Sequence, residues 1–206
     1  MVLVTIEGID GTGKSTLHEA LKEPLADLHP VFTREPGATW IGEQVRRAIA
    51  EEIDPVAEAL LFVADHAAHL AKVVRPALAE GRLVVSDRYI DSRYAYQSAM
   101  LAGIVPEPMQ WLKQVHDAWT VIPDLTILLT IPPEQAIARL GPDRKREHFE
   151  EQDFLEKVQQ NYFTLAEEMP SRFVIVDARK EKEEIVSFCA ALIRQTDGSR
   201  RSRRRR

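Results

Sequence analysis

Cysteine is almost absent from this chain, and long apolar runs are absent altogether. The single cysteine, Cys189, lies in the apolar stretch VSFCAALI, so no internal disulfide can form and we expect a buried, small hydrophobic side chain there. No apolar run approaches the roughly 20 residues that a membrane-spanning helix needs. The N-terminal MVLVTIEGID turns polar early and lacks the charged start of a secretory signal. These absences favour a soluble, unexported protein of a reducing cytoplasm, with no membrane partner.

The body of the chain is also short of basic residues relative to acidic ones. The formal charge is −5, but the last nine residues, GSRRSRRRR, contain six arginines and no acid, and the chain without them carries −11. An acidic body binds nucleic acid poorly, so we expect no nucleic-acid partner and only local basic surface. Residues 198–206 are interpreted either as an RNA-binding or targeting arm or as an expression appendage, and they are left out of the fold prediction.

Residues 1–197 contain no repeat and no linker rich in Pro, Gly or Ser, which predicts a single domain. Short apolar, β-branched runs predict five strands, at residues 2–6, 30–33, 82–86, 125–131 and 172–176. Helical spacing predicts helices between them, at residues 14–28, 55–79, 132–140, 150–169 and 181–194. The predicted fold is α/β, a three-layer, doubly wound, five-stranded parallel sheet that binds ligands at the carboxyl ends of its strands.

A phosphate-binding motif follows the first predicted strand and opens the first predicted helix. The stretch GIDGTGKST matches the pattern G-x-x-x-x-G-K-[ST] in that structural context. Its glycines let backbone N–H groups converge on phosphate oxygens, Lys14 reaches the β and γ phosphates, and the Ser15 hydroxyl binds Mg²⁺. The predicted ATP-binding residues are Gly8, Gly11, Thr12, Gly13, Lys14, Ser15 and Thr16.

Asp10 is a carboxylate inside this loop, where an acid aimed at the phosphates would oppose their binding. We therefore expect Asp10 to point away from ATP and to accept hydrogen bonds from a neutral hydroxyl. The alternative is that Asp10-Gly11 only supplies turn chemistry.

The third predicted strand leads into Asp87 and Arg88, in LVVSDRYIDSRYAYQ. Asp87 stands where P-loop enzymes carry the acid that supports magnesium, and Arg88 can bridge two phosphoryl groups, although a structural salt bridge is the alternative. In TREPGAT, Pro36-Gly37 predicts a turn that projects Arg34 into the same crevice. Two arginines and a metal exceed what one triphosphate needs, which indicates a phosphorylated acceptor.

Over nearly all of residues 1–194 the sequence resembles the thymidylate kinase family, on GIDGTGKST, TREPGAT, LLFVADHAAHL, DRYIDSRYAYQ, PDLTILL and the stretch up to HFEEQDFLEKVQQNY. The resemblance implies transfer of the γ-phosphoryl of ATP to dTMP, with Mg²⁺, in a homodimer. It implies that Asp10 accepts the 3′-hydroxyl of the acceptor and that Arg34 and Arg88 hold its phosphate. It also implies that Phe62, by its helical position alone a core residue, stacks on thymine, and that Tyr96 disfavours ribonucleotides. The same resemblance places Ser92 on the acceptor wall and residues 177–180 on the adenine wall.

Members of the family carry the charge-stabilising arginine either in the phosphate loop or in a lid. Here the loop position is Gly11, so the resemblance assigns this role to a lid at about residues 139–149, within the polar stretch GPDRKREHF. The lid offers Arg139, Arg144, Lys145 and Arg146, and each of these could equally be a solvated loop charge. We favour Arg144 or Arg146 as a catalytic residue, together with Lys14, Asp87 and Arg88.

The chain departs from the family pattern at His66, where arginine usually donates to the thymine base. A histidine is shorter and has fewer donors. Our hypothesis is that Arg93 supplies the missing guanidinium from the opposite wall; the alternative is that it faces solvent. His66 remains a candidate substrate-binding residue, and acceptance of dUMP or a modified deoxynucleotide stays open.

Three other functions remain possible. The first is a kinase of an unphosphorylated deoxynucleoside, against which the pair of arginines argues. The second is a nucleotide-dependent switch or binding protein. The chain has no N-K-x-D motif for reading guanine, which argues against a GTPase. The third is an RNA-associated ATPase that uses the arginine-rich end.

Overall fold

A computed structural model of the chain describes residues 2–37, 39–141 and 151–204, with side chains described as far as Arg200. The strands are β1 (Val2–Glu7), β2 (Val31–Arg34), β3 (Leu83–Asp87), β4 (Leu125–Thr130) and β5 (Phe173–Asp177). They form one sheet in the order β2-β3-β1-β4-β5, and every pairing is parallel. The predicted α/β fold with a five-stranded parallel sheet is confirmed.

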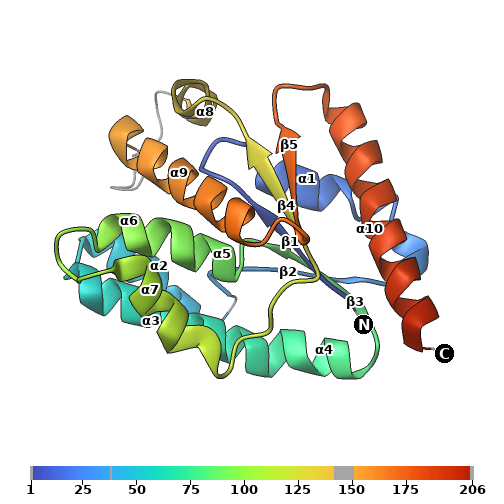
Figure 1. The fold of residues 1–206 in the computed structure, drawn as a ribbon, viewed down its shortest axis with the longest axis horizontal. Helices are drawn as coiled ribbons and strands as arrows, with labels where there is room; N and C mark the ends of the chain where they lie inside the picture. The colour runs from blue at the N-terminus through green and yellow to red at the C-terminus, as the bar shows by residue number, and fades with distance from the viewer. Residues whose placement is uncertain (1, 38, 142–150, 205–206) are drawn as a thin grey trace.

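Helices cover both faces of this sheet (Figure 1). One face carries α1 (Lys14–Ala20), which begins directly after the phosphate loop, and α10 (Lys182–Arg204). The other face carries α3 (Pro55–His69), which continues through a π-helical turn (Leu70–Val74) into α4 (Arg75–Ala79), and α9 (Gln152–Glu168). Since parallel strands need crossover helices, the sheet is buried between two helical layers.

The remaining helices connect these layers. They are α2 (Trp40–Glu51), α5 (Ile90–Ser92), a second π-helical turn (Arg93–Gln97), α6 (Ser98–Met100), α7 (Pro108–Asp117) and α8 (Pro133–Leu140); a 3₁₀ turn (Ala26–Leu28) precedes β2. Helix α2 packs against α3, while α8 packs against α9. The first of the π-helical turns joins two helices of one continuous rod, and the second carries Arg93 and Tyr96. Such turns are frequent at functional sites.

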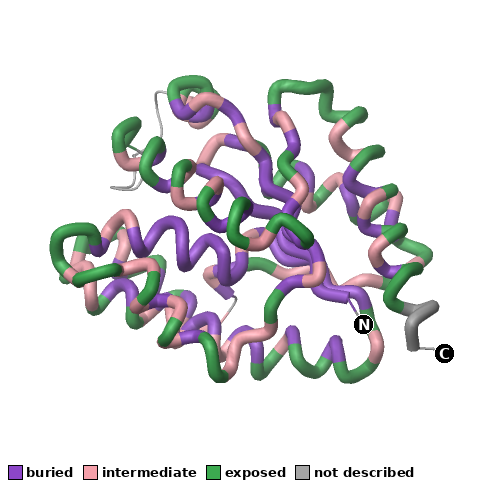
Figure 2. Tube along the Cα trace, in the orientation of Figure 1, coloured by how far each residue is buried: buried purple, intermediate pink, exposed green. Residues whose placement is uncertain are grey.

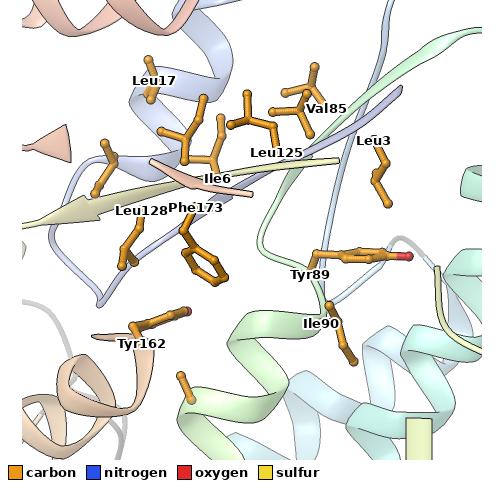
Figure 3. Packing of buried hydrophobic residues seen from close by; sticks show 14 of the residues in the cluster. Leu3, Ile6, Leu17, Val85, Tyr89, Ile90, Leu125, Leu128, Tyr162 and Phe173 are labelled. Carbon is orange, nitrogen blue, oxygen red and sulfur yellow. The ribbon is translucent and has the colours of Figure 1, made fainter. Parts of the chain in front are cut away.

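The core follows the strands, as expected for a sheet covered on both faces. Strands β1 and β3 are buried along their whole length, and Figure 2 shows the buried trace concentrated in the sheet and on the inner faces of the helices. Figure 3 shows Leu17 of α1 on one side of the sheet and Tyr162 of α9 on the other. Cys189 of α10 is fully buried, as predicted from its apolar neighbours.

Helix α10 does not end at residue 197. It continues to Arg204, into the segment that the sequence prediction set apart. Asp197 is buried, and Arg200 forms an ion pair with Asp124, the residue before β4. These contacts tie the last side chains that the structure describes to the sheet.

Candidate active site at the phosphate loop

The phosphate loop leaves β1 at Gly8 and enters α1 at Lys14. Gly8 has φ 140°, and a Cβ there would lie 2.4 Å from the carbonyl oxygen of Leu129 on β4. Gly13 caps α1 in the left-handed conformation, with φ 91°. The loop therefore needs glycine at both ends, and it presents a helix N-terminus that suits an anion.

Gly11, in the middle of the loop, lies against helix α8. A Cβ at Gly11 would come within 2.1 Å of the carbonyl oxygen of Ala136. No side chain, basic or otherwise, fits at this position without moving α8. The absence of a charged side chain at position 11 is thus consistent with the packing, and the loop and the helix that leads toward residue 141 are in direct contact.

A cavity of about 540 Å³ opens over the loop. Residues 10–17 form its floor, and Arg139, Ala178 and Lys180 belong to its walls. Arg139 of α8 donates a hydrogen bond to the carbonyl oxygen of Ala178, 3.0 Å away, which joins two of these walls. The size and the lining suit a nucleotide whose phosphates lie on the loop.

Lys14 is a buried cation at the centre of this floor, with 6% of its side chain exposed. Its Nζ donates a hydrogen bond to the carbonyl oxygen of Ile9 at 2.8 Å and lies 3.9 Å from Oδ1 of Asp10. Burial, helped by the charge of Arg88, lowers the pKa of Lys14 to about 8. The loop thus holds an under-neutralised ammonium group where a phosphate would sit.

Ser15 and Asp87 meet beside Lys14, from α1 and the end of β3. The Ser15 hydroxyl donates to Oδ2 of Asp87 at 2.6 Å, while the buried Oδ1 of Asp87 has no hydrogen-bond partner among the described residues. A hydroxyl and a carboxylate with an unused oxygen are ligands that Mg²⁺ accepts. The pair fits a magnesium ion, although the described residues contain no cluster of three or more acidic, His or Cys side chains that would bind a metal without substrate.

Asp10 does not face the loop amides but joins Arg88 and Tyr96. Nη2 of Arg88 donates to its Oδ1 at 2.5 Å, and the Tyr96 hydroxyl donates to its Oδ2 at 2.9 Å. Burial by itself would raise the pKa of Asp10, but Arg88 and Lys14 outweigh it and lower the pKa to about 2. Asp10 is therefore an ionised acceptor that already binds one neutral hydroxyl.

Arg88 stands at the corner where β3 ends, and its backbone is in the left-handed region, with φ 64°. This conformation is unfavourable for any residue other than glycine, and it persists only where surrounding contacts fix it. Here the backbone N–H of Arg88 donates to Ile6 and its carbonyl oxygen accepts from Ser86. The corner turns the guanidinium toward Asp10 and Ser92.

A second, smaller cavity of about 110 Å³ shares Asp10 and Arg88 with the first. Phe62 of α3 and Arg93, Tyr96 and Gln97 of the second π-helical turn line it. The guanidinium of Arg93 lies 4.3 Å from the centroid of the Phe62 ring. Arg93 is buried, so the alternative that it faces solvent is wrong.

His66 requires a correction, because it does not line either cavity. Its side chain is fully buried, and its Nδ1 and Nε2 lie 2.7 Å from Glu35 and 2.8 Å from Thr120. With both ring nitrogens engaged inside the protein, His66 has no group to offer a substrate.

Arg34 also lies elsewhere than expected. It is exposed at the end of β2 and is not among the residues that line the two cavities. The pleat of the strand explains this position, since Thr33 and Glu35 on either side of Arg34 both turn inward toward His69. A role for Arg34 in holding phosphate stays a prediction.

Ser92 lines the smaller cavity and also bonds to buried groups behind it. Its hydroxyl donates to Oε2 of Glu7 at 2.5 Å and lies 2.8 Å from the hydroxyl of Tyr162, while Arg88 donates to it at 3.2 Å. The sequence analysis missed Glu7 and Tyr162. The only signal in the sequence was Glu7 itself, an acid at the end of an otherwise largely apolar strand. Burial, together with the charge of Asp91, raises the pKa of Glu7 to about 7.

The predicted lid residues Arg144, Lys145 and Arg146 lie outside the residues that the structure describes.

Within the described part of the chain, no helix is both long and apolar enough to span a bilayer.

Comparisons with known proteins agree on one family. The family model described as thymidylate kinase matches residues 6–188. The chain is 61% identical over 204 residues to a probable thymidylate kinase of Methanoculleus marisnigri, covering 99% of this chain and 98% of that protein. A probable thymidylate kinase of Methanospirillum hungatei is 60% identical over 193 residues, 94% of each chain. One of Natronomonas pharaonis is 49% identical over 186 residues, 90% of this chain and 93% of the other.

Proposed function

Because the chain belongs to the thymidylate kinase family, we propose that it transfers the γ-phosphoryl group of ATP to dTMP, giving ADP and dTDP. The observation that supports this most is the pair of cavities that meet at Asp10 and Arg88, one over the phosphate loop and one against Phe62. Two nucleotides bound end to end would bring their phosphates together at that junction. An oxygen of the dTMP phosphate then attacks the γ phosphorus while the bond to the β–γ bridging oxygen breaks.

On the donor side, the loop amides and Lys14 hold the β and γ phosphates of ATP. Ser15 and Asp87 would hold Mg²⁺, which neutralises charge on the transferring phosphoryl group when bound. Because the acceptor phosphate is already anionic near neutral pH, no general base is needed. Positioning and electrostatic stabilisation carry the rate enhancement.

On the acceptor side, Arg88 binds the dTMP phosphate and Asp10 accepts the 3′-hydroxyl. Asp10 is suited to this role because it is ionised and already accepts a hydroxyl from Tyr96. The ring of Phe62 supplies an apolar wall for the base, and Arg93 donates to a base carbonyl in place of His66. Tyr96, which packs between Asp10 and Arg88, crowds the sugar and disfavours ribonucleotides.

The charge that stabilises the transition state comes from the segment after α8, through Arg144 or Arg146. The contact between Gly11 and Ala136 supports this division, since position 11 of the loop has no room for a basic side chain. We also propose, from the family resemblance, one kinase domain over residues 1–197, a homodimer and a cytoplasmic location. Size-exclusion chromatography with light scattering tests the dimer.

A coupled ATP assay across deoxynucleoside and ribonucleoside monophosphates, with thymidine included, tests the function. We expect dTMP to be the best acceptor, thymidine to be inactive and Lys14→Ala to abolish transfer. Arg93→Ala is expected to raise the KM for dTMP about tenfold or more, as for loss of a charged hydrogen bond. Phosphorylation of thymidine in preference to dTMP would replace this proposal with a deoxynucleoside kinase, and ATP hydrolysis without any acceptor would point to a switch or ATPase.

A further inference from the structure

A buried carboxylate lies beneath the smaller cavity and connects it to two histidines. Glu35, the residue after β2, has a fully buried side chain. Its Oε1 accepts hydrogen bonds from Nδ1 of both His66 and His69 on α3, each at 2.7 Å. Burial by itself would raise the pKa of Glu35, but the two histidines and Arg93 outweigh it and hold the pKa well below its usual value. The carboxylate is therefore charged and firmly held on one side.

The two histidines are themselves fixed at their other nitrogens. Nε2 of His66 lies 2.8 Å from the hydroxyl of Thr120, and Nε2 of His69 lies 2.7 Å from that of Thr33. Each ring is thus tied to both a carboxylate and a hydroxyl, which fixes its orientation. The result is a rigid cradle that leaves only Oε2 of Glu35 for another partner.

That partner is Arg93. Its Nε lies 3.4 Å from Oε2 of Glu35, while its guanidinium lies against the Phe62 ring. The contact is an ion pair but not an aligned hydrogen bond, since neither atom has a hydrogen-bond partner among the described residues. Such contacts are often long before substrate binds and shorten afterwards.

The guanidinium of Arg93 also has donors to spare. Arg93 is 3% exposed, and its Nε is buried with no hydrogen-bond partner among the described residues. A buried donor without an acceptor is costly, so a ligand that draws the guanidinium and Glu35 into alignment is favoured. Glu35 is on the side of Nε, which leaves the two terminal nitrogens for the cavity that Arg93 lines.

We propose that Glu35, fixed by His66 and His69, is a positioning residue that aims the guanidinium of Arg93 at the carbonyl oxygen of the acceptor base. This inference rests on the proposed function and adds to it a source of selectivity. A guanidinium held in one orientation accepts a base with a 4-oxo group, as in thymine and uracil. It opposes the 4-amino group of cytosine, which is a donor.

The test compares dUMP with dCMP, which share the sugar, the phosphate and the lack of a 5-methyl group. Glu35→Gln keeps the size of the side chain and an oxygen for the histidines but removes the charge that holds Arg93. We expect the KM for dUMP and dTMP to rise about tenfold, as for loss of a charge-assisted contact. The preference for dUMP over dCMP is expected to fall by a similar factor, with the KM for ATP unchanged. Glu43→Gln, the same change on the exposed face of α2, is the matched control and is expected to have no effect.

Two further variants separate positioning from a structural role. Glu35→Gln in an Arg93→Ala background is expected to cause no additional loss of dUMP preference. If circular dichroism shows that Glu35→Gln does not fold, His69→Ala, which removes one of the two donors to Glu35, is expected to shift the preference in the same direction by a smaller factor. An equal rise in KM for dUMP and dCMP in the variant that folds would overturn the inference. The proposed dTMP kinase function would stand in that case. Failure of the wild-type protein to phosphorylate dTMP or dUMP would overturn the proposed function itself.

Discussion

Lys14 is expected to destabilise the free protein although we propose that activity requires it. Its ammonium group is buried in the phosphate loop and forms a long ion pair with Oδ1 of Asp10, 3.9 Å away. Arg88 adds a second positive charge nearby. The pKa falls from 10.5 to about 8. Since each tenfold change in proton affinity corresponds to about 1.4 kcal/mol, the charged form costs the fold about 3 kcal/mol at neutral pH.

Replacement of Lys14 by methionine removes this cost and keeps most of the side-chain volume. Some of the gain is lost, because Asp10 gives up one cationic neighbour; Ile9 loses one donor but still accepts from the Thr12 hydroxyl at 2.8 Å. We expect Lys14→Met to raise the free energy of unfolding at pH 7 by about 1 to 3 kcal/mol and to abolish transfer. Urea unfolding without nucleotide measures the first effect, and the coupled assay measures the second.

The pH dependence gives this prediction its sign. Above pH 8 the folded wild-type protein releases the Lys14 proton, while the unfolded chain keeps it until about pH 10.5. The unfolded state then binds more protons, so the wild-type protein gains stability with rising pH and the advantage of Lys14→Met shrinks. Lys22→Met, at an exposed position just after α1, is the control and is expected to change neither quantity. A Lys14→Met protein less stable than wild type at pH 7, or an advantage that does not shrink above pH 8, would refute the reasoning.

The remaining predictions concern the loop and the core. Asp10→Asn is expected to raise the KM for dTMP about tenfold or more, with a smaller effect on ATP. It is also expected to cost stability above about pH 4 but not below pH 2, because the folded pKa of Asp10 is about 2; a constant stability difference over this range would contradict it. Gly11→Ala is expected to destabilise by about 1 to 3 kcal/mol more than Gly103→Ala in thermal unfolding, because both glycines have positive φ but only Gly11 contacts Ala136. Burial raises the pKa of Cys189 to about 12, so iodoacetamide is expected to label it at pH 8 only in denaturant; rapid labelling of the native protein would be inconsistent with that burial.

The sheet could be predicted from the sequence because its strands are buried on both faces. Five runs of apolar, β-branched residues gave the strands to within a residue or two at each end, and the helical stretch 55–79 is one rod in the structure. The helices that escaped prediction are α2, α7 and the segment from Ile90 to Met100. Nearly every residue of that segment is buried, including polar ones, so it shows no alternation of an apolar and a polar face. Its polar side chains are satisfied by distant partners, as Asp91 is by Arg172, and such pairs cannot be read from local pattern.

The site was predictable where one motif holds all of its members, and less so where it is assembled across the chain. The phosphate loop needed only a short stretch and its context. His66 was misplaced because its partner, Glu35, lies 31 residues away in sequence. One signal was present, because His66 and His69 are three residues apart and so share a face of α3. Two histidines side by side on a buried helix face require an acceptor inside the protein, and a carboxylate directly after a strand could supply it.

The presence of Asp10 in the phosphate loop can be explained by the charges that the protein must balance when no nucleotide is bound. Lys14, Arg88 and Arg93 line the two cavities, and without a ligand or a neighbouring carboxylate their charges would be buried and uncompensated. Asp10 lies beside the first two and Glu35 beside the third. Each carboxylate is placed where it need not leave when the substrate binds, since Asp10 faces the junction of the cavities and Glu35 lies beneath the smaller one. The two carboxylates therefore help to keep these cations charged in the folded protein, and under the proposed function the same carboxylates would orient the sugar and the base.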